Sequence, residues 1–140
     1  MHCPVCGINI PRFLLSVIVG FAFIFGLDFV IHHNLLMDLY EQTASLWRSE
    51  KAMESFFSII IARTILLAAI PAYIYTRNHE GKGILEGVRF GIPLALLFAL
   101  MMSSSYIWMP IPLELALGWA GAGILQGLGL GIIFSLTYKK

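Results

Sequence analysis

The chain has 140 residues, of which 59% are hydrophobic and only 12% are charged. A soluble domain is about half apolar and about a quarter charged, so most of this surface is expected to face lipid. The formal net charge is +1 and no basic cluster is present, which excludes a nucleic-acid-binding protein. The segments between the apolar runs are too short to build an aqueous core. We therefore expect a single membrane domain over residues 1–140, with lipid as its principal partner.

Four apolar runs predict four membrane-crossing helices. Each is close to the roughly 20 residues that a helix needs to cross a bilayer, and they cover about residues 13–33, 55–76, 84–108 and 113–138. The first run is not followed by a small-residue cleavage site, so we expect it to stay as an anchor. Pro71 predicts a kink in the second helix, and Met109-Pro110-Ile111-Pro112 predicts a tight reversal between the last two. The expected fold is all-α, an integral membrane antiparallel four-helix bundle.

The distribution of basic residues predicts the orientation of this bundle. Lys and Arg in short loops are retained on the cytoplasmic side of a membrane. In the four-helix topology one side carries Arg12, Arg77, Lys82, Arg89, Lys139 and Lys140, and the other carries only Arg48 and Lys51. Both termini are therefore predicted to be cytoplasmic.

The connection between the first two helices predicts an amphipathic helix over about residues 35–48. Apolar side chains, including Leu39 and Trp47, fall near one helical face, and polar ones, including Asp38 and Glu41, fall on the other. Such a helix either lies on the outer membrane surface or continues the first helix and packs its apolar side on the bundle. In both cases the segment caps the outer face.

Two series of glycines predict close packing of helices. Glycines recur at every fourth position around the last two helices, at Gly83, Gly87 and Gly91 and at Gly123, Gly127 and Gly131. A stripe without side chains allows two helix backbones to approach closely. The partner is either the neighbouring helix of the same chain or a second subunit.

Ionisable residues within the apolar runs are the strongest candidates for a site, because a charge at the centre of a bilayer costs roughly 2.5–3.5 kcal/mol. Asp28, Arg63 and Glu114 all fall in the outer half of the expected bundle. His32 follows Asp28 by four residues and therefore shares its helix face. We expect these four side chains to converge beneath the outer surface.

Three interpretations of this cluster are open. An ion pair of Arg63 with Asp28 or Glu114 would fix the register of the helices. Two carboxylates, a cation and an imidazole would also make a proton-sensitive or cation-binding site. In the third interpretation Arg63 makes no contact in the bundle and extends to the membrane surface. Asp28 and His32 alone are too few ligands for a transition metal.

The charged residues at the start of the third expected helix carry a weaker signal. Lys82, Glu86 and Arg89 are spaced by four and three residues at the start of the third helix, which is typical of a solvated, self-paired first turn.

At the amino terminus, His2-Cys3-Pro4-Val5-Cys6-Gly7 resembles one knuckle of a zinc ribbon. Cys3, Cys6 and His2 would leave a zinc ion at least one ligand short unless a second subunit supplies the rest. Two reduced cytoplasmic thiols without a bound metal, or a redox pair, are the alternatives.

A series of short motifs is spread over roughly residues 12 to 138. They are Asp28 to His33, Leu39-Tyr40, Leu46-Trp47-Arg48, Met53, Glu86-Gly87-Val88-Arg89-Phe90-Gly91, Pro110-Ile111-Pro112 and Trp119. This pattern resembles small, uncharacterised four-helix membrane proteins of bacteria. The resemblance implies the four-helix fold and the bacterial inner membrane, and it implies no catalytic residues. The Cys3 and Cys6 knuckle is not part of it.

The sequence contains no Gly-x-Ser-x-Gly elbow and no glycine-rich phosphate loop. Our leading hypothesis is therefore a non-enzymatic multi-pass membrane protein, either an accessory or structural subunit or a small-ligand binder. The alternative is a small oligomeric transporter for protons or cations, in which Asp28 or Glu114 titrates. A further alternative is a metal-handling protein that uses the amino-terminal cysteine pair. Besides lipid, a second copy of the chain or another membrane protein is the expected partner.

Overall fold

The computed structural model describes residues 7–139. Helices make up all the regular elements of this part of the chain. Four of them are long and apolar enough to cross a membrane, namely Ile10–Leu35, Phe57–Arg77, Ile84–Trp108 and Leu113–Thr137. The expectation of an all-helical chain with four long apolar helices is confirmed. His2, Cys3 and Cys6 lie outside the described residues.

The first span has two parts, α1 (Ile10–Asp28) and a π-helical segment, η1 (Phe29–Leu35). The Asn9 side chain caps α1 by accepting a hydrogen bond from the Arg12 backbone amide at 3.4 Å. At the other end the amide of Leu36 bonds to the carbonyl of Ile31 at 2.9 Å, five residues back. Single π-helical turns inside α-helices occur frequently at functional sites, and this one follows directly on Asp28.

The segment that follows η1 is broken into short elements. They are α2 (Met37–Gln42), η2 (Ala44–Leu46) and α3 (Glu50–Glu54). One continuous amphipathic helix was expected over residues 35–48, but Thr43 ends α2. Its hydroxyl bonds to the carbonyl of Leu39 at 2.7 Å and also accepts from the Trp47 indole at 2.9 Å. This local bonding competes with the helical pattern.

The remaining long helices are α4 (Phe57–Arg77), α5 (Ile84–Ser103) and α7 (Leu113–Thr137), with the short α6 (Ser105–Trp108) after α5. Pro71 lies inside α4 and Pro93 inside α5. The expected reversal at Pro110 and Pro112 lies between α6 and α7.

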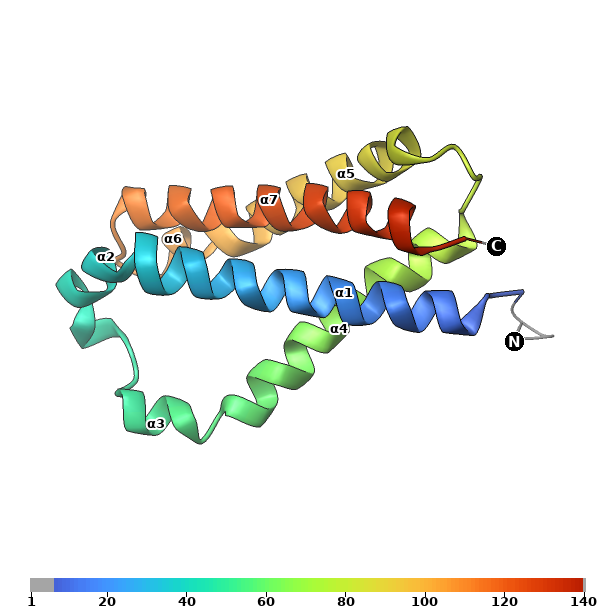
Figure 1. Ribbon diagram of the computed structural model, residues 1–140. Coiled ribbons are helices and arrows are strands. Elements are labelled where there is room, and N and C mark those ends of the chain that lie inside the picture. The colour runs from blue at the N-terminus through green and yellow to red at the C-terminus, as the bar shows by residue number, and fades with distance from the viewer. Residues whose placement is uncertain (1–6, 140) are drawn as a thin grey trace.

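Two ends of the molecule can be distinguished in Figure 1. At the terminal end, the start of α1, the end of α4, the start of α5 and the end of α7 come together. The Asn9 amide there donates to the Tyr138 hydroxyl at 3.2 Å. At the opposite end, called the α2 end, lie η1, α2, α6 and the start of α7. Helix α4 crosses α1 steeply, and its first turns diverge from the other helices.

Glycines bring α5 and α7 into close contact. A Cβ added to Gly127 would overlap the backbone of Ala95, and one added to Gly123 would lie 2.6 Å from the Ala99 amide nitrogen. The glycine stripes therefore serve packing within one chain. Gly83 is not part of this contact, since it precedes α5 with a φ of 68° and has open space around it.

Two apolar clusters fill the interior. The cluster toward the terminal end includes Ile24, Ala68, Leu130 and Phe134, all 0% exposed. The other surrounds Leu115 at the α2 end, where Leu36, Leu39, Tyr40, Leu46 and Trp47 pack against it. The apolar side of the segment after η1 thus packs on the bundle.

Candidate ligand-binding groove

Three helices bring polar side chains together at the α2 end. Asp28, the last residue of α1, accepts a hydrogen bond from Nε2 of Gln126 on α7, with 2.5 Å between Nε2 and Oδ1. Gln126 is 3% exposed. His32 Nε2 lies 3.8 Å from the same carboxylate oxygen. An aspartate at the edge of an apolar helix thereby gains two polar partners.

Tyr40 links this pair to the aromatic side chains of the same end. Its hydroxyl is 2.6 Å from His32 Nδ1 and accepts from the Trp119 indole nitrogen at 2.6 Å. Burial raises the pKa of the Tyr40 hydroxyl, so at neutral pH the hydroxyl keeps its proton. A hydroxyl that accepts from Trp119 still has its own proton to donate, and it donates this proton to Nδ1 in the tautomer of His32 that carries its proton on Nε2. In this tautomer the proton on Nε2 faces Asp28.

Three aromatic rings pack around this hydrogen-bonded chain. Trp47 meets Tyr40 edge-on with 5.4 Å between ring centroids, and it meets Trp119 edge-on at 6.0 Å. Edge-to-face pairs of this kind add about 0.5–1.5 kcal/mol beyond their burial. The rings come from the segment after η1 and from α7, so they fasten that segment to the bundle.

The aromatic groove opens beside these rings, with a volume of about 690 Å³. Its walls comprise Tyr40, Trp47 and Trp119, three methionines (Met37, Met53 and Met109) and Leu46. Arg48, His32 and His33 supply the ionisable groups. The Arg48 guanidinium lies 4.9 Å from the centroid of the Phe56 ring, at the junction of α3 and α4. A mostly apolar concavity with a few polar groups is the usual form of a small-molecule site.

The other two residues of the expected charged cluster are placed differently. Arg63 is exposed on α4 and acts on Asp28 and His32 through Coulomb forces, but it forms no ion pair within 4.0 Å in the part of the chain that is described. Glu114 is exposed in the first turn of α7. Asp28 and His32 are brought together, Arg63 lies near them without an ion pair, and the Gln126 amide, not a cation, is the hydrogen-bond donor to Asp28.

Sequence reasoning missed Gln126, Tyr40 and Trp119 as members of the site. A signal existed for Gln126, because an amide side chain in an apolar, glycine-rich helix needs a polar partner. Tyr40 and Trp119 are 79 residues apart in the sequence, and no periodicity connects them.

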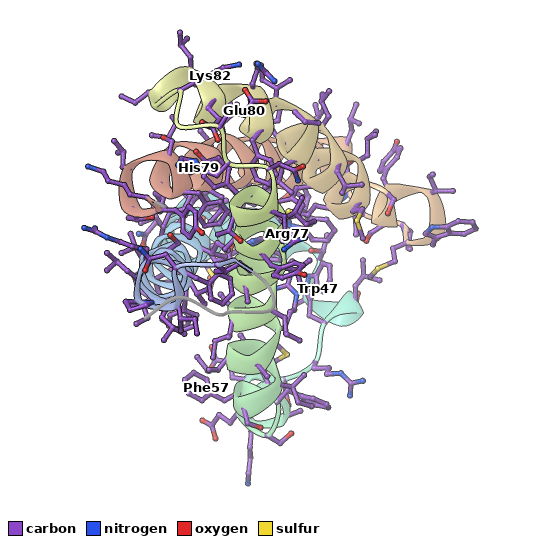
Figure 2. The ribbon with its side chains drawn as sticks, turned by 90° about the vertical axis from the view of Figure 1, so that its right-hand side faces the viewer. Trp47, Phe57, Arg77, His79, Glu80 and Lys82 are labelled. Carbon is purple, nitrogen blue, oxygen red and sulfur yellow. The ribbon has the colours of Figure 1, made fainter. Side chains whose placement is uncertain are left out.

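A second polar cluster lies at the terminal end, onto which Figure 2 looks. Glu86 is 8% exposed and accepts hydrogen bonds from the Glu80 amide at 2.9 Å, the Lys82 amide at 2.7 Å and His79 Nδ1 at 3.0 Å. Lys82 and Arg89 pair with Glu80, at 2.5 and 3.9 Å. The solvated, self-paired turn expected of Lys82, Glu86 and Arg89 is therefore wrong for Glu86, which fastens the loop between α4 and α5.

Across residues 7–139, no three side chains of His, Cys, Asp or Glu gather as metal ligands would. Zinc at His2, Cys3 and Cys6 stays a prediction, which a Cys3→Ser, Cys6→Ser variant would test by losing a stoichiometric zinc ion. Comparisons with protein-family models, with curated proteins and with solved structures found no match.

Proposed function

We propose that the chain is a non-enzymatic inner-membrane protein, built as an antiparallel four-helix bundle, that binds an amphiphile with an anionic head group in the aromatic groove. The lengths and hydropathies of the four helices support the membrane placement. The basic residues Arg77, Lys82 and Arg89 lie at the terminal end, which by the positive-inside rule is cytoplasmic. The α2 end then faces away from the cytoplasm.

The composition of the groove carries this proposal. Methionine and aromatic side chains offer an adaptable apolar wall, which suits a hydrocarbon chain. Among the described residues that line the groove, Arg48 is the one with a permanent charge, and this charge is positive. A carboxylate or phosphate head group complements this cation.

Binding suits this site better than bond making. Both nitrogens of His32 face other side chains, and the Tyr40 hydroxyl is shared between His32 and Trp119. No hydroxyl or thiol lines the groove as a nucleophile beside a free base in the described residues. The polar groups of the groove therefore hold one another in position, together with the rings that line the groove.

Quenching of tryptophan fluorescence tests the proposal. Two of the three tryptophans line the groove, and the third, Trp108, is 80% exposed, so the protein is prepared with Trp108→Phe. In nanodiscs of neutral phosphatidylcholine, a brominated fatty acid should quench the emission saturably, and its uncharged amide should not.

Replacement of Arg48 supplies the matched comparison. Arg48→Gln should weaken binding of the fatty acid about tenfold, as expected for a lost charge-assisted hydrogen bond. Lys51→Gln removes a nearby exposed charge on α3 that does not line the groove, and it should leave the affinity unchanged. Quenching that is non-saturable, or the same for acid and amide, contradicts the proposal.

A proton-coupled transporter is the second candidate, favoured by the Asp28 and His32 pair inside a candidate membrane span. The larger apolar cluster lies between the two ends, with Ile24, Leu130 and Phe134 fully buried. Transport therefore requires a second conformation that opens this core. It predicts pH-dependent flux in liposomes that Asp28→Asn abolishes, and absence of flux with protons, metal cations and lipophilic cations would eliminate it.

A further inference from the structure

A separate cavity lies at the terminal end, where α4 ends and α5 begins. Its volume is about 310 Å³. The walls combine both signs of charge with aromatic surface, from Glu80, Glu86, Arg89, Asn78, Tyr75 and Phe90. Neither the aromatic groove nor its proposed ligand involves any of these residues.

Tyr75 presents an unused polar group to this cavity. The side chain is 2% exposed, and its hydroxyl is buried without a hydrogen-bond partner in the described part of the chain. The hydroxyl faces the Glu86 carboxylate but makes no hydrogen bond of acceptable geometry with it. A buried hydroxyl left unbonded costs about 1–3 kcal/mol, so this position favours a ligand that supplies the missing bond.

The charges around the cavity define the ligand. Among the described residues, Glu86 Oε2 accepts one hydrogen bond, from the Lys82 amide, which leaves this oxygen one free lone pair. A primary ammonium group has three N–H donors and can satisfy both oxygens. Arg89, 71% exposed at its side chain, lies on the same cavity and is suited to a phosphate. A zwitterion that carries both groups matches the two signs of charge.

An apolar surface continues from this cavity along α5. A shallow pocket of about 510 Å³ shares Glu86 and Arg89 with the first cavity and adds Lys82, Leu85, Val88 and Ile92. Leu85 is 78% exposed and Ile92 is 50% exposed. The candidate membrane span begins at Ile84, so a chain lying on Leu85 and Ile92 would run into the hydrocarbon region.

We propose that the terminal end binds an aminophospholipid with a primary ammonium, as in phosphatidylethanolamine. The ammonium donates to Tyr75 and Glu86, the phosphate pairs with Arg89 and Lys82, and an acyl chain lies along Leu85, Val88 and Ile92. The apolar pocket beside the cavity favours this lipid over a free zwitterion of the same head-group chemistry.

Native mass spectrometry in mild detergent tests this assignment with three lipids of identical acyl chains. Phosphatidylethanolamine should bind at one site about tenfold more tightly than phosphatidylcholine, because a trimethylammonium group cannot donate hydrogen bonds. Phosphatidylglycerol, which has the phosphate but no ammonium, should also bind more weakly. Equal binding of the three lipids overturns the proposal.

Two tyrosine variants locate the site. Tyr75→Phe removes only the buried hydroxyl and should weaken binding of phosphatidylethanolamine about tenfold. Tyr73→Phe makes the same change on the exposed side of α4, where Tyr73 is 49% exposed, and should have no effect. The Tm of each variant is measured first, so that the two lipid affinities are compared at a temperature at which both proteins are folded. An unchanged affinity in Tyr75→Phe, or an equal loss in Tyr73→Phe, contradicts the assignment.

Soluble glycerophosphoethanolamine distinguishes the source of the head group. It has the same ammonium and phosphate without acyl chains, and it should compete only at concentrations far above those of the lipid. If it binds as tightly as the lipid, the ligand is a free zwitterion and the lipid assignment is wrong.

Discussion

The two ends of the molecule use their polar side chains in different ways. At the α2 end, a series of contacts between side chains runs from Asp28 through His32 and Tyr40 to Trp119. At the terminal end, Glu86 accepts two backbone amides and Asn9 bonds to the backbone carbonyl of Lys139 at 3.1 Å. The bonds to Glu86 hold the loop between α4 and α5 in place, whereas the side-chain contacts at the α2 end form part of the wall of the aromatic groove.

This difference assigns separate tasks to the two ends. The terminal end is held by the buried carboxylate of Glu86 and by direct contact between α1 and α7, including a hydrogen bond of 2.7 Å between Ser16 and Thr137. The α2 end is assembled from short elements that α7 holds through aromatic contacts. Helices α2, η2 and α3 contain no buried residue, and segments with few buried apolar contacts are the ones that open and adapt to ligands. We therefore expect variants at the two ends to separate stability from binding.

The largest effect is expected at the close contact between α5 and α7. In Gly127→Ala the new methyl group would overlap the Ala95 backbone, so α5 and α7 must move apart. The free energy of unfolding, measured by SDS titration in mixed micelles, should fall by about 3 kcal/mol.

Gly121→Ala is the matched control on the same helix, because open space surrounds that position. Alanine is the better helix former by roughly 0.5–1 kcal/mol, so this variant should be as stable as the wild type or slightly more stable. Equal effects of the two substitutions would mean that α5 and α7 are not packed through Gly127.

The next largest effect should appear at the α2 end. Gln126→Leu removes the donor that Asp28 uses, and the carboxylate left without it should lower the free energy of unfolding by about 2 kcal/mol. Adding Asp28→Asn removes the charge and should recover part of the loss. Without any recovery in the double variant, the Asp28 and Gln126 bond is not the source of the effect.

A smaller effect is expected from Tyr40→Phe, which keeps the ring but removes the hydroxyl between His32 and Trp119. The free energy of unfolding should fall by about 1 kcal/mol, and binding in the aromatic groove should weaken more than stability suggests. Tyr106→Phe, on exposed α6, is the control. A loss of stability with fully retained binding would mean that the Tyr40 hydroxyl does not contribute to binding in the groove.

The smallest effect should come from Glu80 at the terminal end, because its ion pairs are exposed. The hydrogen bond from Lys82 lowers the pKa of Glu80 below its ordinary 4.5. A carboxyl group whose pKa is lower in the folded protein contributes stability above its unfolded pKa and loses it as the pH falls through the folded value. Glu80→Gln should thus change the Tm only slightly at pH 7, and the difference should vanish in acid. A large difference that persists in acid would contradict this.

The sequence was sufficient for features that depend on length and local spacing. Apolar runs gave the four helices, the glycine spacing indicated the close approach at Gly127, and a spacing of four residues paired Asp28 with His32. Features that depend on tertiary contacts were beyond it. Gln126 reaches Asp28 across 98 residues. The end of α2 at Thr43 is a local feature, since Leu39 and Trp47 are each four residues away, but the alternation of apolar and polar residues does not reveal it.

Arg63 shows why the charged cluster was predicted only in part. Sequence position placed it in the same outer half of the bundle as Asp28, but depth does not specify the direction of a side chain around α4. The helix turns Thr64 and Ala68 inward, which are 1% and 0% exposed, and Arg63 is left exposed. The buried amide of Gln126 satisfies Asp28 without bringing a second charge into the bundle.

The central claim, that the aromatic groove at the α2 end binds an anionic amphiphile, is tested most directly by single-tryptophan variants. One protein keeps only Trp119, and a second keeps only Trp108, which is 80% exposed and does not line the groove. A brominated fatty acid in phosphatidylcholine nanodiscs should quench the first saturably, and the second should show only the linear background of membrane partitioning. Equal, non-saturable quenching of the two proteins would contradict the claim.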